Sequence, residues 1–164
     1  MSDAADAVVL VTPKLFEAIL SAQKNLLYVS TPDAARALAQ LRQLAMRSGQ
    51  AVYAWNADDG ISPMRDDGIR IGTTHRFGDA LRHIQRSRHF GVYVFVGVAG
   101  KLSGDEIGRL KWIAENEGPA SRKVVFLGPS FKAPTELLNL MEFMRCNDSA
   151  RTNLRLRDGT WKRA

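Results

Sequence analysis

The chain has 164 residues, 45% of them hydrophobic, which is enough to bury the core of a single domain. Its 23 lysines and arginines exceed its 17 acidic residues, and the formal charge of +6 weakly favours an acidic partner. A single cysteine, Cys146, excludes an internal disulfide, and no apolar run approaches the length of a membrane span. The N-terminus is acidic where a secretory signal would be basic, so we expect a soluble, cytoplasmic protein.

Predicted strands and helices alternate through the first third of the chain. The apolar residues 7–12 indicate a short strand or a cover segment, and a helix begins directly after them at a Thr-Pro pair. An apolar run at 26–30 predicts the first core strand, and a helical pattern follows at 33–48. Residues 52–55 predict the second strand.

The next twenty or so residues, 56–75, show little regular pattern. They contain the sequence Asp-Asp-Gly twice, first with Asp58 and Asp59 and then with Asp66 and Asp67, and this sequence is typical of turns. A loop of this length in a compact domain is uncommon and is often functional. As an alternative, the two acidic pairs could converge on a divalent cation if the loop folds back on itself.

The alternation resumes in the second half of the chain. The run at 91–98 has no polar alternation, so we expect a strand buried on both faces, as in a parallel sheet. A capping box at 103–106 begins a helix, and Thr135 is expected to cap a short one. The remaining elements expected here are helices at 77–88, 103–117 and 135–140, and strands at 123–128 and 141–146.

This alternation predicts βαβ units in a three-layer α/β/α fold, with a mainly parallel, Rossmann-like sheet of about five strands. We expect one domain over residues 1–146, in which residues 1–25 form a cover segment and a helix. Residues 147–164 are expected to form a polar, basic tail, with a weak hairpin around Asp158 and Gly159.

The turn after the first core strand is where such folds bind phosphate. A nucleoside-triphosphatase carries G-x-x-x-x-G-K-[ST] there, so that backbone N–H groups and a lysine hold the phosphates. This chain has Ser30, Thr31, Pro32 and Asp33 instead, with no glycine or lysine and with a carboxylate that repels an anion. The stretch 94–101 also lacks the carboxylate that would position Mg²⁺. We therefore expect neither the Walker A nor the Walker B function, and no hydrolysis of nucleotides.

Three segments carry a resemblance to a known family. They are LYVSTPD at 27–33 with its helix, VYAWN at 52–56 with Asp59 and Gly60, and SRKVVFLGP at 121–129 with APTEL at 133–137. Over residues 25–145 the chain resembles the N-terminal, non-catalytic domain of a class of AAA+ ATPases found in cyanobacteria, chloroplasts and many other bacteria. The resemblance implies a RecA-like or AAA-like sheet, a degenerate relative of the P-loop fold. In that family the domain precedes an active ATPase module, so we expect a stand-alone version of the domain here.

Other catalytic or metal-binding arrangements have little support in the sequence. His75, His83 and His89 do not provide the i,i+4 pair that favours zinc, and Cys146 is expected to be a buried, inert thiol. The tryptophans are expected to pack, except Trp161, whose neighbours are basic. We predict no catalytic residue, no cofactor-binding residue and no metal ligand.

The preferred function is a non-enzymatic protein-interaction or regulatory module that docks onto a protein partner, either an ATPase or a second copy of the chain. The contact surface is expected on the loop 56–75 and the helix that follows it. Its residues are Asp58, Asp59, Arg65, Asp66, Asp67, Arg70, Arg82 and Arg86.

Two alternatives remain. The first is a nucleic-acid-binding protein that uses one side of the helix 77–88, where His75, Arg82, Arg86 and His89 are expected to lie together, and the basic tail. The tail residues for this role are Arg151, Arg155, Arg157, Trp161, Lys162 and Arg163. The second is a small-ligand site at the carboxyl ends of the strands. It would be formed by Ser30, Thr31, Gly97, Gly128 and Ser130.

Overall fold

The computed structural model describes residues 9–66, 68–98, 100–116 and 122–147, together with the backbone at 156–157 and 160–161. The described elements follow the predicted alternation. They are β1 (Val9–Leu10), α2 (Thr12–Ser21), β2 (Leu26–Ser30), α3 (Ala34–Ser48), β3 (Val52–Asn56), β4 (Gly60–Pro63), α4 (Phe77–Arg86), β5 (Gly91–Val96), α5 (Gly104–Glu115), β6 (Arg122–Gly128), the 3₁₀ helix η1 (Thr135–Leu140) and β7 (Met141–Cys146). Two short strands, β8 (Leu156–Arg157) and β9 (Thr160–Trp161), pair as the expected hairpin.

Seven of the described strands form one sheet, in the order β1-β7-β2-β6-β5-β3-β4. All neighbouring pairs in this sheet are parallel except β3 and β4. The mainly parallel sheet is confirmed, but the expected number of about five strands was too low. The two additional strands lie at the edges: β1 has two residues, and β4 lies in the region expected to be an irregular loop.

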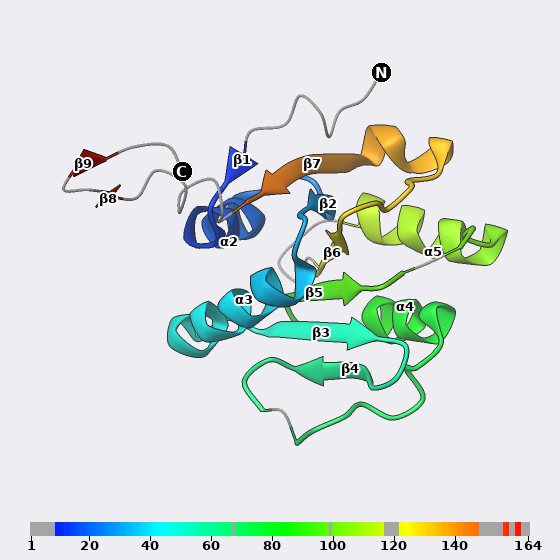
Figure 1. Cartoon of the computed structure of the whole chain (residues 1–164). Helices are drawn as coiled ribbons and strands as arrows, with labels where there is room; N and C mark the ends of the chain where they lie inside the picture. The colour runs from blue at the N-terminus through cyan, green and yellow to red at the C-terminus, as the bar shows by residue number, and fades with distance from the viewer. Residues whose placement is uncertain are drawn as a thin grey trace.

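The helices form a layer on each face of the sheet, which confirms the three-layer α/β/α fold (Figure 1). The layer with α2 and α3 buries Leu15, Ile19 and Leu41 against one face of the central strands. The layer with α4, α5 and η1 contributes Leu81 and Leu110 to a separate, more aromatic cluster on the other face. Burial on both faces explains the uninterrupted apolar runs of β2, β5 and β6.

The strand β4 folds back antiparallel on β3, with Asn56 opposite Gly60 and Tyr53 opposite Pro63. Ile61 is fully buried, although its segment is too short to show a period in the sequence. Gly60 has a positive φ of 72°, which permits the tight reversal between the strands. The expectation of a structureless loop at 56–75 was therefore wrong for residues 60–63.

Helix boundaries mostly follow local sequence signals. The Asp33 carboxylate accepts the Arg36 backbone N–H at 3.0 Å and caps α3, while Ser103 and Glu106 form the predicted capping box of α5. The exception is η1, which is a 3₁₀ helix in which Thr135 is the first residue and not the cap. None of the helices in the described residues is both long enough and apolar enough to cross a bilayer.

Candidate functional site

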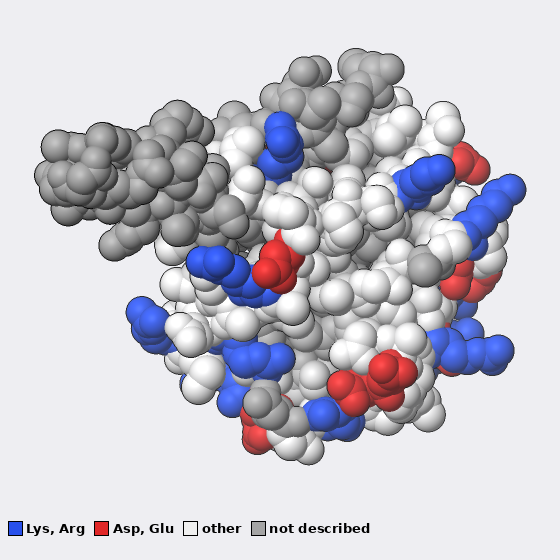
Figure 2. All heavy atoms as spheres, viewed as in Figure 1, with Lys and Arg blue, Asp and Glu red and all other residues white. Residues whose placement is uncertain are grey.

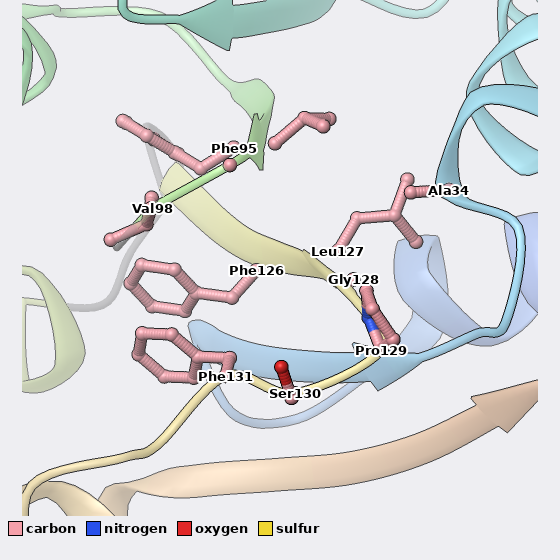
Figure 3. A pocket seen from close by; sticks show the side chains of 11 residues that line it. Ala34, Phe95, Val98, Phe126, Leu127, Gly128, Pro129, Ser130 and Phe131 are labelled. Atoms are coloured by element: carbon pink, nitrogen blue, oxygen red, sulfur yellow. The ribbon is translucent and has the colours of Figure 1, made fainter. Parts of the chain in front are cut away.

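Strands β2 and β6 are neighbours, but the helices that follow them lie on opposite faces of the sheet. Such a point opens a crevice at the carboxyl ends of the strands, where ligands of open α/β sheets usually bind. Here the crevice is a hollow of about 260 Å³, lined by the last residues of β5 and β6, by the residues that follow them and by the first residue of α3 (Figure 3). It is the position at which the sequence predicted a small-ligand site.

The side chains that line the hollow are almost all apolar. The rings of Phe126 and Phe131 stack with centroids 4.2 Å apart and planes 5° apart, and Phe95 and Val98 lie beside them (Figure 3). Ser130 carries the one polar side chain among the lining residues. A hollow of this kind suits an apolar group better than a phosphate, because it has no cationic side chain to offset the charge.

Only some of the residues expected to form a small-ligand site line this hollow. Gly97, Gly128 and Ser130 line the hollow, whereas Thr31 is buried, with 4% of its surface exposed, and does not line it. Sequence reasoning missed Phe131, which completes the aromatic wall. The Tyr28 hydroxyl accepts the Phe131 backbone N–H at 3.1 Å, a contact between distant segments that local pattern does not reveal.

In the turn between β2 and α3, several backbone N–H groups are already hydrogen-bonded within the chain. The Thr31 backbone N–H donates to the Gly128 carbonyl at 3.1 Å, and the Asp33 N–H donates to the Thr31 hydroxyl at 3.3 Å. With the Asp33 carboxylate on the Arg36 N–H, the helix N-terminus is occupied by a side chain of the chain itself. An incoming phosphate would have to displace these bonds and approach a carboxylate.

The first acidic pair of the loop 56–75 is held in a turn after β3. The Asn56 side-chain oxygen accepts the backbone N–H groups of Asp58 and Asp59, both at 2.9 Å. Asp59 also pairs with Arg70 across the loop at 3.5 Å. Two of the predicted contact residues, Asp59 and Arg70, therefore stabilise the loop in addition to lying on its surface.

The second half of the loop is exposed. Arg65 and Asp66 lie at the surface, the Asp66 carboxylate accepts the Gly68 N–H at 3.0 Å, and Asp67 lies outside the described residues. Ile69 is 48% exposed, one of five large apolar side chains that are exposed among the described residues. Figure 2 shows basic and acidic side chains alternating along the lower margin of the molecule, over β4 and its turns.

Asp66, the described member of the second acidic pair, does not join the first pair in a cluster that could hold a metal ion. Within the described ranges, no group of three or more histidine, cysteine or carboxylate side chains comes together. Cys146 is buried, as expected, with its sulfur 3.6 Å from the Thr12 hydroxyl. Trp55 packs in the core, but Trp112 is 38% exposed and lies beneath the Arg122 guanidinium at 5.4 Å from the ring centroid.

On α4 the structure gathers only part of the predicted basic side. Arg82 and Arg86 line a second hollow of about 300 Å³, together with His83 from the helix and Thr73 from the preceding turn. His75 precedes α4 and His89 follows it, and neither lines the hollow. Burial lowers the pKa of His83, so its neutral form is favoured.

The basic tail does not enter the described site. Arg151, Arg155, Lys162 and Arg163 lie outside the described residues, and for Arg157 and Trp161 the backbone alone is described, in β8 and β9. The tail's part in nucleic-acid binding stays a prediction.

Comparison with known proteins identifies one family. A family model described as the SpoVK-like AAA ATPase, N-terminal domain, matches residues 12–146, which span every described element from α2 to β7. No curated protein sequence matches the chain.

Proposed function

Because this chain belongs to the family of SpoVK-like AAA ATPase N-terminal domains, we propose that it is a non-enzymatic interaction or regulatory module. It binds a protein partner, an ATPase or a second copy of itself, and does not hydrolyse nucleotide. The scaffold resembles a nucleotide-binding fold, but it lacks the residues of Walker A and Walker B.

The observation that carries the proposal is the closed turn between β2 and α3. Three N–H groups of this turn, those of Thr31, Asp33 and Arg36, are already bonded to Gly128, Thr31 and Asp33, at 3.0–3.3 Å. The adjacent hollow offers aromatic rings and no cation. A triphosphate would lose its hydration there without gaining charged partners, which is costly for a multiply charged anion.

The contact surface lies on the loop 56–75. Ile69 is exposed at the loop surface and is flanked in sequence by Arg65, Asp66 and Arg70, an apolar residue with a charged rim as in protein interfaces. The end of the loop is anchored to the core, since the Trp55 indole donates to the Thr74 carbonyl at 2.7 Å. A loop ordered before binding loses less conformational entropy when it meets a partner.

The test compares two single substitutions of exposed apolar residues. Ile69→Ser removes the apolar centre of the loop, and Met46→Ser removes a side chain that is 55% exposed on α3. Wild-type and variant chains are immobilised and exposed to native extract. Each retained protein is purified, and its Kd for the wild-type chain and for each variant is measured. We expect a partner whose affinity falls at least about tenfold with Ile69→Ser and not with Met46→Ser. If both variants keep every partner with the wild-type Kd, the loop is not the interface.

Deletion of the whole loop is a poorer experiment, because it removes the buried residues Ile61, Met64 and Thr74 and would unfold the sheet edge.

The non-enzymatic part is tested separately with ATP and GTP. We expect no turnover by the pure chain and no nucleotide-induced rise in Tm. Turnover that is abolished by Ser130→Ala in the hollow would overturn the proposal.

A further inference from the structure

The hollow beside α4 is polar, and it is formed by this helix and by the end of the loop 56–75. Its helix wall carries Asp79, Arg82, His83 and Arg86, spaced so that all four share one side of α4. The opposite wall is the turn that carries Thr73. Residues from two segments therefore enclose one hollow of about 300 Å³.

The two guanidinium groups in the hollow differ in their partners. Arg82 pairs with Asp79 at 3.5 Å, so part of its charge is balanced. Arg86 has no hydrogen bond or ion pair with any described residue, and it lies one helical turn beyond Arg82. The hollow thus holds one more cationic side chain than it holds carboxylates, and that side chain is unengaged.

The turn opposite these arginines is strained. Thr73 has a φ of 58°, the one positive value among the described residues other than glycine, and it is β-branched. Its hydroxyl donates to the Gly72 carbonyl at 2.6 Å. Strained conformations of this kind occur most often at ligand-binding and active sites.

From this arrangement we propose that the hollow lined by Thr73, Arg82, His83 and Arg86 binds the phosphate monoester of a small molecule. A guanidinium presents parallel N–H donors that match two phosphate oxygens, and two such forks on successive turns match a dianion. The Thr73 hydroxyl lines the hollow and would donate to a third oxygen by turning away from the Gly72 carbonyl. The inference does not rest on the proposed protein-interaction role, although Thr73, Arg82 and Arg86 belong to the predicted contact region, because it requires only the hollow and a phosphate.

The geometry favours a localised dianion over a nucleic-acid strand. Asp79 bounds the hollow on the helix side and would repel a phosphodiester chain that continues along α4. The volume is at the lower end of the range for small-molecule sites, which suits a sugar phosphate.

The experiment titrates the full chain with ribose 5-phosphate and, as the matched control, with unphosphorylated ribose. Binding is followed through backbone amide shifts in two-dimensional ¹H–¹⁵N NMR spectra. We expect saturable shifts at Thr73, Thr74 and residues 82–86 with ribose 5-phosphate only. Arg86→Gln should weaken the Kd about tenfold, the loss expected for one charge-assisted contact. Arg47→Gln, which removes an exposed arginine at the end of α3, should leave the Kd unchanged.

Three results would overturn the proposal. The first is the absence of saturable shifts in the wild-type chain, a readout that needs no variant. The second is equal weakening by Arg86→Gln and Arg47→Gln, which would indicate only general charge attraction. The third is tighter binding of an oligothymidylate than of ribose 5-phosphate at the same salt concentration, lost with Arg86→Gln, which would assign the hollow to nucleic acid.

Discussion

Gly60, at the reversal between β3 and β4, has the tightest surroundings of any described glycine. A Cβ at this position would lie 2.6 Å from the Thr74 hydroxyl oxygen and 3.2 Å from the Thr74 backbone carbon, and φ is 72°. We expect Gly60→Ala to destabilise the fold by about 2 kcal/mol or more, because steric overlap adds to the cost of positive φ. Gly49→Ala is the control, since φ is 76° but nothing lies within 4 Å, and it should cost about 1 kcal/mol. Urea unfolding measures both, and equal losses would contradict the steric argument.

His83 provides a second test at the residue scale, through pH. Burial lowers its pKa below 6.5, so in the window below about pH 6.5 the unfolded chain binds a proton that the native chain does not. The free energy of unfolding should therefore fall as the pH drops through this window. We expect His83→Gln to flatten that dependence, measured by urea unfolding at several pH values. The control is His75→Gln, at an exposed histidine outside the hollow, which should show the same change of unfolding free energy with pH as the wild type. If His83→Gln also shows the wild-type change with pH, this account is wrong.

At the scale of elements, one buried hydroxyl helps to hold β4 in place, in addition to the pairing of β4 with β3. Thr74 accepts the Ile61 backbone N–H at 2.9 Å and donates to the Ile71 carbonyl at 2.6 Å. The isosteric change Thr74→Val leaves both buried backbone groups without this partner and should cost about 1–3 kcal/mol. Thr74→Ser keeps the hydroxyl and should lose only the contribution of one methyl, about 1 kcal/mol. Thermal unfolding compares the two, and a Val variant as stable as the Ser variant would disprove the role of the hydroxyl.

The same element explains why the sequence misled about the region 56–75. Turn residues were identified correctly, because Asp-Asp-Gly carries its conformational preference locally. The strand between them has a single fully buried isoleucine, and its pairing is set by contact with β3 and Thr74. Such contacts leave no period in a four-residue segment.

For the whole molecule, the order of strands predicts a gradient of local stability. β2, β6 and β5 lie in the middle of the sheet under both helix layers, whereas β1 and β4 form its edges. We expect the amides of Tyr28, Val94 and Val125 to exchange with solvent only through global unfolding, and those of Leu10 and Ile61 to exchange faster through local opening. Native-state hydrogen exchange measures this, and uniform protection across the sheet would be evidence against a separable edge.

The sequence by itself determined the alternation of strands and helices, the capped ends of α3 and α5, and the missing phosphate-binding residues after β2. These features depend on residues close together in the chain, where periodicity, caps and turn chemistry act directly. The tertiary structure decided which distant segments meet: Tyr28 of β2 with Phe131 beyond β6, and Trp55 of β3 with Thr74 beyond β4. Contacts of this kind follow from the order of strands in the sheet, which places distant segments side by side and which local pattern does not encode.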